Sequence, residues 1–159
     1  MTELTVQQFN GHVGAIVMNL QALETAIRFF FFRKNGEINP FPKPGVEEAP
    51  SSSLTAYREL GKWIRKFNSG LTKNELPKFS ISGDVVEIRD AIAHGRLIAP
   101  DPPSLPFTLW KFGEPVNGVS PVRFSVVLTA EWLTKTTTMI DGEFRKVIDC
   151  HKGRGYAGY

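Results

Sequence analysis

An apolar stripe that starts near the beginning of the chain is the sequence feature that most constrains the fold. Its members recur in alternating steps of four and three residues, which keeps them on one face of an α-helix. The sequence therefore predicts a long amphipathic helix that packs along a second helix, with Asn35 and Gly36 as its C-terminal stop. The stripe comprises Phe9, Val13, Ile16, Leu20, Leu23, Ile27 and Phe30.

The C-terminal end of this first helix is apolar on nearly every side. Phe29, Phe31 and Phe32 flank the stripe there. A helix end of this kind is expected to be buried on several sides. The surface that covers it is either the rest of the fold or a second copy of the chain.

A proline-rich loop and a second helix follow. Residues 36–50 contain four prolines, which are incompatible with helix interiors, so this segment is predicted as a loop. Residues 51–53 are serines that offer an N-cap for the second helix, which ends at residues 68–70. The inward stripe of this helix comprises Leu54, Tyr57, Leu60, Ile64 and Phe67.

The second half of the chain predicts two further helices with a hairpin between them. A third helix runs from near Ser82 to a stop at Gly95. The extended linker 100–106 follows it, and then residues 107–112 and 122–128 read as two strands joined by turn residues. Thr129 then caps a fourth helix. The inward residues are Val85, Ile88 and Ile92 in the third helix, and Leu133, Thr136 or Thr137, Ile140, Phe144 and Val147 in the fourth.

These segments together predict a mainly α fold, an antiparallel four-helix bundle with a small β-hairpin inserted before the last helix. With 159 residues, of which 42% are hydrophobic, the chain is long enough for one domain with its own core. We expect residues 1–150 to form this domain. Residues 151–159 are rich in glycine and are predicted to form a flexible C-terminal tail.

The cysteine content and the start of the chain indicate a cytoplasmic protein. Cys150 is the single cysteine and cannot form an internal disulfide, which suits a reducing compartment. Glu3 stands where a secretion signal would carry a basic residue. The apolar run Phe29–Phe32 is far shorter than the about 20 residues of a membrane span, so no membrane association is expected.

Positive charge is concentrated in one segment, although the net charge of the whole chain is only +3. Residues 51–80 contain six lysines and arginines against two acidic residues. A basic face on the second helix could bind RNA phosphates, and a solvated helix surface is the alternative. The candidate substrate-binding residues are Arg58, Lys62, Arg65 and Lys66. Three aromatic residues could stack on bases, although such residues more often belong to a core: Tyr57, Trp63 and Trp110.

Most catalytic signatures are missing from the sequence. It contains no glycine-rich phosphate-binding loop, no dinucleotide fingerprint, no His-Glu-x-x-His and no Gly-x-Ser-x-Gly elbow. One cysteine and three widely separated histidines do not suggest a metal site. We therefore expect neither a metal nor an organic cofactor.

One polar constellation remains, near the end of the third helix. Asp90 and His94 are four residues apart and share a helix face, and Arg89 directly precedes Asp90. The structural interpretation is a weak Asp90–His94 pair, with His94 placed favourably near the negative end of the helix dipole. The functional interpretation is a catalytic or binding site.

The sequence Arg-Asp-Ala-Ile-Ala-His-Gly at residues 89–95 resembles the Arg-x4–6-His signature of HEPN (higher eukaryotes and prokaryotes nucleotide-binding) domains. The order of elements over roughly residues 5–150 is similar to theirs as well. The resemblance implies a four-helix, usually dimeric domain. Many such members are metal-independent ribonucleases of toxin–antitoxin, abortive-infection and CRISPR systems, and others are inactive adaptors or binding modules.

The chemistry of these residues agrees with that resemblance. RNA cleavage by its own 2′-hydroxyl needs a base, an acid and positive charge on the phosphorane-like transition state. His94 can serve either proton role, Arg89 can hold phosphate oxygens, and Asp90 can orient Arg89 or the imidazole. One chain has one histidine in the motif, so a two-fold homodimer would supply both proton-transfer groups in a composite cleft.

The predicted function is therefore a metal-independent endoribonuclease of toxin or defence type. The alternative is a catalytically inactive HEPN-like module that binds nucleotide, RNA or protein. RNA and an antitoxin or other protein are the expected partners besides a second copy. Glu24 and Arg28, four residues apart on the first helix, could support the site through Arg89, and an ordinary exposed pair is the alternative.

Overall fold

The computed structural model describes residues 4–37, 50–56, 58–101 and 104–156. The chain divides into two compact units, which are taken in turn below. Unit 1 comprises residues 1–20 and 84–140, and unit 2 comprises residues 21–83 and 141–159. The predicted loop at residues 36–50 lies largely outside the described residues.

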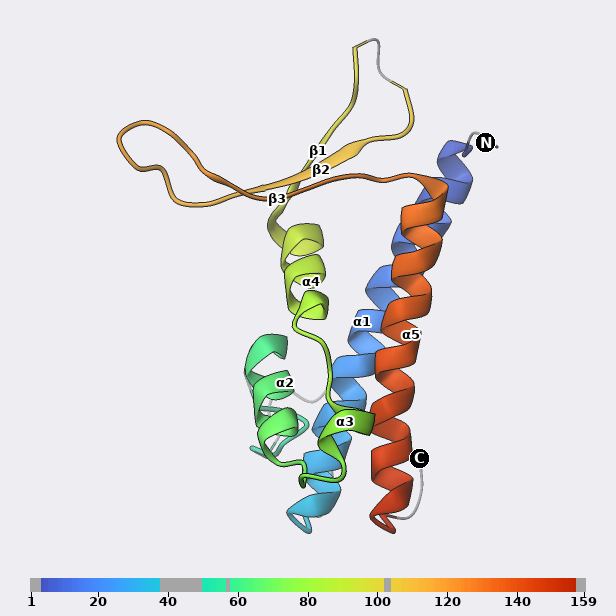
Figure 1. Cartoon of the computed structure of the whole chain (residues 1–159), viewed down its shortest axis with the longest axis vertical. Coiled ribbons are helices and arrows are strands. Elements are labelled where there is room, and N and C mark those ends of the chain that lie inside the picture. Colours follow the sequence, from blue (N-terminus) through green and yellow to red (C-terminus); the bar gives the residue numbers. More distant parts are fainter. Residues whose placement is uncertain (1–3, 38–49, 57, 102–103, 157–159) are drawn as a thin grey trace. The chain divides into compact units, whose positions relative to one another are not determined.

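The described part of the chain is mainly helical and carries a small antiparallel sheet, as Figure 1 shows. This confirms the predicted fold class in its coarse form. The helices are α1 (Val6–Lys34), α2 (Leu60–Ser69), α3 (Leu76–Phe79), α4 (Asp84–His94) and α5 (Ala130–Gly153). The strands are β1 (Arg96–Ile98), β2 (Thr108–Phe112) and β3 (Val122–Val127).

Helix α1 follows its apolar stripe. All members of the stripe are buried except Val13, which is half-buried. The helix ends at Lys34, where Gly36 adopts a positive φ of 63° and its N–H donates to the Arg33 carbonyl. The predicted helix and its glycine stop are confirmed, because only a residue without a side chain adopts this backbone conformation easily.

Among the described helices, α1 is the one long and apolar enough to cross a membrane by length and composition. The core helix of a soluble protein passes the same test. Ile16 in unit 1 and Ile27 in unit 2 are both fully buried within the chain, as expected for a core helix. Nothing in this helix contradicts a soluble protein.

Unit 1 is built around the three-stranded sheet. The central strand β2 pairs antiparallel with β1 on one side and with β3 on the other. Because successive side chains of a strand point to opposite faces, the row Leu97–Leu109–Val126 lies on one face. Leu109 is buried, which makes this the inner face. Val13 of α1 and Leu133 of α5 line an apolar cavity of about 310 Å³ together with Leu97 and Leu109.

The predicted hairpin is confirmed as β2 and β3, but the structure adds a third strand. β1 has only three residues, all exposed, so the sequence shows no alternating pattern that predicts it. Its pairing with β2 places Arg96 opposite Trp110. The cap at Thr129 is also confirmed, because its hydroxyl accepts a 3.1 Å bond from the Trp132 N–H.

Gly95 lets the end of α4 approach β2 closely. A Cβ at this position would overlap the Ala91 carbonyl oxygen and would lie 2.8 Å from Leu109 Cδ1 and 2.9 Å from the Trp110 carbonyl oxygen. These distances leave no room for any side chain. The glycine therefore does more than end the helix, because it sets the spacing between α4 and the sheet.

Replacing Gly95 with Ala is expected to destabilise the protein by about 1–3 kcal/mol, the usual cost of overpacking. Gly14→Ala is the matched control in the same unit, because a Cβ there meets nothing within 4 Å. That change should instead stabilise α1 by about 1 kcal/mol. Urea unfolding followed by circular dichroism measures both effects, and equal stability of the two variants would contradict the close approach at Gly95.

Unit 2 has an aromatic core at the C-terminal end of α1. The Phe30 ring lies 5.0 Å from Phe67 and 5.8 Å from Tyr156, and Phe31 lies 5.6 Å from Trp63. Phe30, Phe31 and Phe32 are all buried within the chain. The apolar end of the helix is thus covered by the fold itself, and it no longer argues for a second copy.

The second helix begins later than predicted. Helix α2 starts at Leu60, whereas residues 53–55 form a turn. The Ser52 N–H donates to the Thr55 hydroxyl, and the Ser52 hydroxyl accepts from the Leu54 and Thr55 N–H groups. Hydroxyl groups that bond to nearby backbone in this way compete with helix formation. The short helix α3 was not predicted, and Tyr57 lies outside the described residues.

The predicted flexible tail is wrong for residues 151–156. Helix α5 continues to Gly153, and its Val147 and Cys150 are buried. Beyond it, the Arg154 guanidinium donates to both Glu75 oxygens, at 2.9 and 2.7 Å, and to the Gly70 carbonyl at 3.0 Å. These bonds hold the end of the chain to the segment before α3. Residues 157–159 lie outside the described part.

Acid should weaken this attachment. The bonds from Arg154 and the Thr72 N–H lower the Glu75 pKa from 4.5 to about 2, so the pair stabilises the fold fully above pH 4.5. This stabilisation is lost as the pH falls from 4.5 toward 2. Glu75→Gln should lower the melting temperature at pH 7. Between pH 7 and pH 3 the melting temperature of this variant should fall by less than that of wild type.

Thermal unfolding by circular dichroism at both pH values provides the measurement. Asp141→Asn is the control in unit 2, because the Asp141–Arg145 ion pair is largely exposed and should contribute little. A Glu75→Gln variant as stable as wild type at pH 7 would rule out the anchoring role.

Candidate functional site

Helix α4 in unit 1 carries the motif residues. Asp84 and Glu87 lie in its first turn, where negative charge is favourable, and His94 is its last residue. Val85, Ile88 and Ala91 form the buried face. Burial of that face leaves the polar residues of the motif partly or fully accessible.

Arg89, Asp90 and Lys111 form a small ionic cluster. Arg89 Nη1 donates to Asp90 Oδ1 at 2.7 Å, and Lys111 Nζ lies 3.4 Å from Asp90 Oδ2. About 30% of each side chain is exposed, with values of 30%, 31% and 28% in that order. Asp90 therefore holds two cations beside the end of α4. The cluster retains a net positive charge and free N–H donors, which suits the binding of an oxyanion.

Sequence reasoning missed Lys111. The residue stands in β2 two positions after the buried Leu109, so strand alternation places it on the inner face. A charged side chain on an inward position requires a partner, and this is the signal that could have identified it. Only the sheet pairing brings β2 to α4.

His94 is exposed and lies one turn beyond Asp90 on the same helix. In the part of the chain that the structure describes, its side chain makes no hydrogen bond or ion pair with Asp90 or any other residue. The structural interpretation, an Asp90–His94 pair, is therefore wrong. The sequence left two roles open for Asp90, to orient Arg89 or to orient the His94 imidazole. The structure contains the contact with Arg89. The imidazole of His94 is left accessible for a ligand or a second chain.

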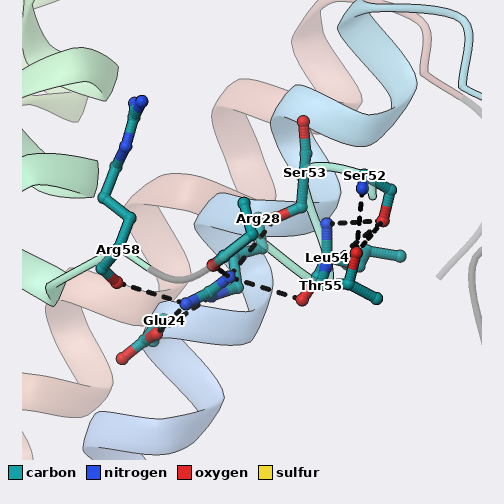
Figure 2. Close-up of polar contacts among 8 residues, drawn as sticks. Glu24, Arg28, Ser52, Ser53, Leu54, Thr55 and Arg58 are labelled. Atoms are coloured by element: carbon teal, nitrogen blue, oxygen red, sulfur yellow. Dashed lines mark hydrogen bonds and ion pairs between the residues drawn. The ribbon is translucent and has the colours of Figure 1, made fainter. Parts of the chain in front are cut away.

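Glu24 and Arg28 belong to a different arrangement, in unit 2 (Figure 2). Arg28 Nη2 donates to Glu24 at 2.6 Å, and its Nη1 donates to the Ala56 carbonyl at 2.7 Å. Further bonds of 3.3–3.4 Å reach the carbonyls of Ser53, Leu54 and Arg58. Both side chains are partly buried, so the interpretation as an ordinary exposed pair is wrong. Arg28 instead attaches residues 53–58 to α1.

The predicted substrate-binding residues lie in unit 2 and are all exposed, with Lys62, Arg65 and Lys66 on α2 and Arg58 just before it. Lys62 pairs with Glu59 at 3.6 Å, and the Lys66 ammonium lies 4.3 Å from the Phe31 ring centroid. Arg58 and Lys66 each lie 5.2 Å from the Trp63 ring. Trp63 is itself buried, so it belongs to the core and is not a surface for stacking bases. Arg58, Lys62, Arg65 and Lys66 form a basic surface over that core.

Two other chemically reactive groups are buried in unit 2. Burial raises the pKa of the Cys150 thiol and lowers the pKa of His151. Both changes favour the neutral forms, which is typical of core residues. Among the described residues, no group of three His, Cys, Asp or Glu side chains could hold a metal ion.

No protein-family model, curated protein or solved structure matches the chain. The HEPN resemblance of residues 89–95 therefore rests on the motif and the order of elements alone.

Replacing Arg28 with Lys should destabilise the protein by about 2 kcal/mol, because the charge is kept but the planar donors to the carbonyls are lost. Arg33→Lys is the control, since Arg33 is exposed at the end of the same helix. Urea unfolding measures the difference. If Arg28→Lys is as stable as Arg33→Lys, Arg28 does not attach residues 53–58 to α1.

Proposed function

We propose that this protein is a metal-independent endoribonuclease that cleaves RNA through attack of its own 2′-hydroxyl. The observation that carries the proposal is the arrangement on α4, where Asp90 holds the Arg89 guanidinium and His94 stands accessible one turn away. In this mechanism Arg89 binds the scissile phosphate and neutralises the developing charge. His94 transfers protons to and from the reacting oxygens.

Lys111 adds a second cation to the site. Its contact with Asp90 keeps the ammonium near Arg89, so the pair together offers more charge to a phosphate than Arg89 alone. The basic surface of α2 provides further candidates for contacts with the RNA backbone. In the cytoplasm, where we expect the protein, magnesium would not be needed for any step of this mechanism.

The proposal includes a homodimer in a HEPN-like four-helix arrangement. Each chain supplies one motif histidine, and cleavage requires both an acid and a base. A two-fold axis near the ends of the α4 helices would bring two His94 and two Arg89 side chains to one cleft. The system would be of toxin or defence type, with an antitoxin or another protein as a further partner.

A second candidate is a catalytically inactive HEPN-like module that binds nucleotide, RNA or protein. Its support is the same Asp90 carboxylate, which is engaged with Arg89 and Lys111 and does not orient His94. An unoriented imidazole is a poor general acid or base, but the cations still suit anion binding.

Cleavage of labelled RNA in EDTA by wild type, His94→Ala and Arg89→Lys distinguishes the two candidates. His94→Ala should lower the rate about 10²–10⁴-fold, because proton transfer is lost. Arg89→Lys should also slow cleavage, because it keeps the charge and loses the planar fork. Products should carry a 2′,3′-cyclic phosphate and a 5′-hydroxyl, and DNA should resist.

His12→Ala is the matched control, since His12 is a half-exposed histidine of α1 in the same unit. Light scattering at micromolar concentration tests the dimer. The assignment is wrong if His94→Ala and Arg89→Lys cleave as fast as wild type while folded. If wild type cuts no RNA but binds a partner in a way that depends on Arg89, the binding module is correct.

A further inference from the structure

The outer face of the sheet in unit 1 presents aromatic and basic side chains. It is opposite to the inner face that contains Leu109. The strand register places Arg96, Trp110 and Ser125 in one row and Ile98, Thr108 and Val127 in the next. Ile98 and Val127 are 46% and 47% exposed, and Phe112 is 37% exposed. This surface is called the outer face below.

Two aromatic rings on the outer face are parallel. The Trp110 and Phe112 rings stack with an interplanar angle of 7° and a centroid distance of 6.0 Å. The Arg96 guanidinium lies 5.9 Å from the Phe112 ring centroid. Parallel rings with a guanidinium beside one of them offer a stack that a planar base can extend, and base–aromatic stacking tolerates every sequence.

The charge of the sheet is entirely positive. The three strands contain Arg96, Lys111 and Arg123 and no acidic residue. Lys111 lies on the inner face with Asp90. Arg123 lies at the irregularity where the pairing of β2 with β3 shifts register, beside Gly113, so strand alternation does not assign it to the outer face. The excess of positive charge on the strands favours a polyanion over a neutral peptide or a second copy of the same positive surface.

We propose that the outer face binds single-stranded RNA, with Trp110 and Phe112 stacking on bases and Arg96 contacting phosphates. The proposal rests on the proposed function for its choice of RNA. β1 begins two residues after His94, so the strand that contributes Arg96 continues directly from the motif. Bases can stack on these rings only when they are unpaired, so a duplex should bind more weakly.

Binding is measured by fluorescence anisotropy with a labelled ten-nucleotide 2′-O-methyl RNA, which lacks the attacking hydroxyl and cannot be cleaved. Trp110→Ala and Phe112→Ala should each weaken binding about tenfold, as expected for loss of one stacking contact. Arg96→Gln should reduce the slope of log Kd against log salt by about 0.7. Trp110→Phe keeps a ring and should retain most of the affinity.

Val119→Ala is the control, because Val119 is an exposed apolar residue of the same hairpin that lies in its turn, beyond the strands. Circular dichroism confirms that each variant is folded, and the exposed Phe112 keeps the test valid if Trp110→Ala is unstable. Unchanged affinity in Phe112→Ala and Arg96→Gln overturns the proposal. A wild-type dimer that Phe112→Ala converts to monomer, with RNA binding unchanged, also overturns it and assigns the face to a second copy.

The experiment separates this inference from the proposed function. If wild type cleaves no RNA but binds it through Trp110 and Phe112, the nuclease fails and the stacking surface stands. If cleavage depends on His94 while the outer-face variants bind and cleave as wild type, the stacking surface fails and the nuclease stands.

Discussion

The close approach of α4 to β2 at Gly95 is the constraint on which unit 1 depends. Because no side chain fits between this residue and the Trp110 carbonyl, the last turn of the motif helix touches the backbone of the central strand. That contact brings Lys111 within reach of Asp90 and turns the opposite side of the strand outward. The ionic cluster and the outer face thus have one structural cause.

Unit 2 is held together by arginines that bind backbone carbonyls in irregular segments. Such carbonyls lack the partners that a helix or sheet provides, and burying them unpaired is costly. Arg28 satisfies the carbonyls of Ser53, Leu54, Ala56 and Arg58, and Arg154 satisfies that of Gly70 while pairing with Glu75. Planar, permanently charged guanidinium groups are suited to several acceptors at once, which a lysine cannot match. Glu24 and Arg28 therefore belong to the architecture of this unit.

The candidate site was predictable where it depends on local spacing. Arg89, Asp90 and His94 follow from one helical segment, and their positions on α4 agree with that pattern. Their partners did not follow, because Asp90 engages Lys111 from a strand 21 residues away and leaves His94 without a carboxylate. Sequence spacing shows which residues share a helix face, but it does not show which distant side chain competes for the same carboxylate.

The sequence by itself determined the long first helix, its glycine stop, the capped last helix and the β2–β3 hairpin. Each depends on periodicity or on the backbone preferences of glycine and on hydroxyl caps, which act over a few residues. Tertiary structure alone decided the strand β1, the late start of α2 and the anchored residues 151–156. β1 exists through pairing with β2, and Arg154 is ordered by Glu75 at a distance of 79 residues along the chain. Interactions between segments so far apart have no signature in local spacing, because their free energy depends on which surfaces the whole fold brings together.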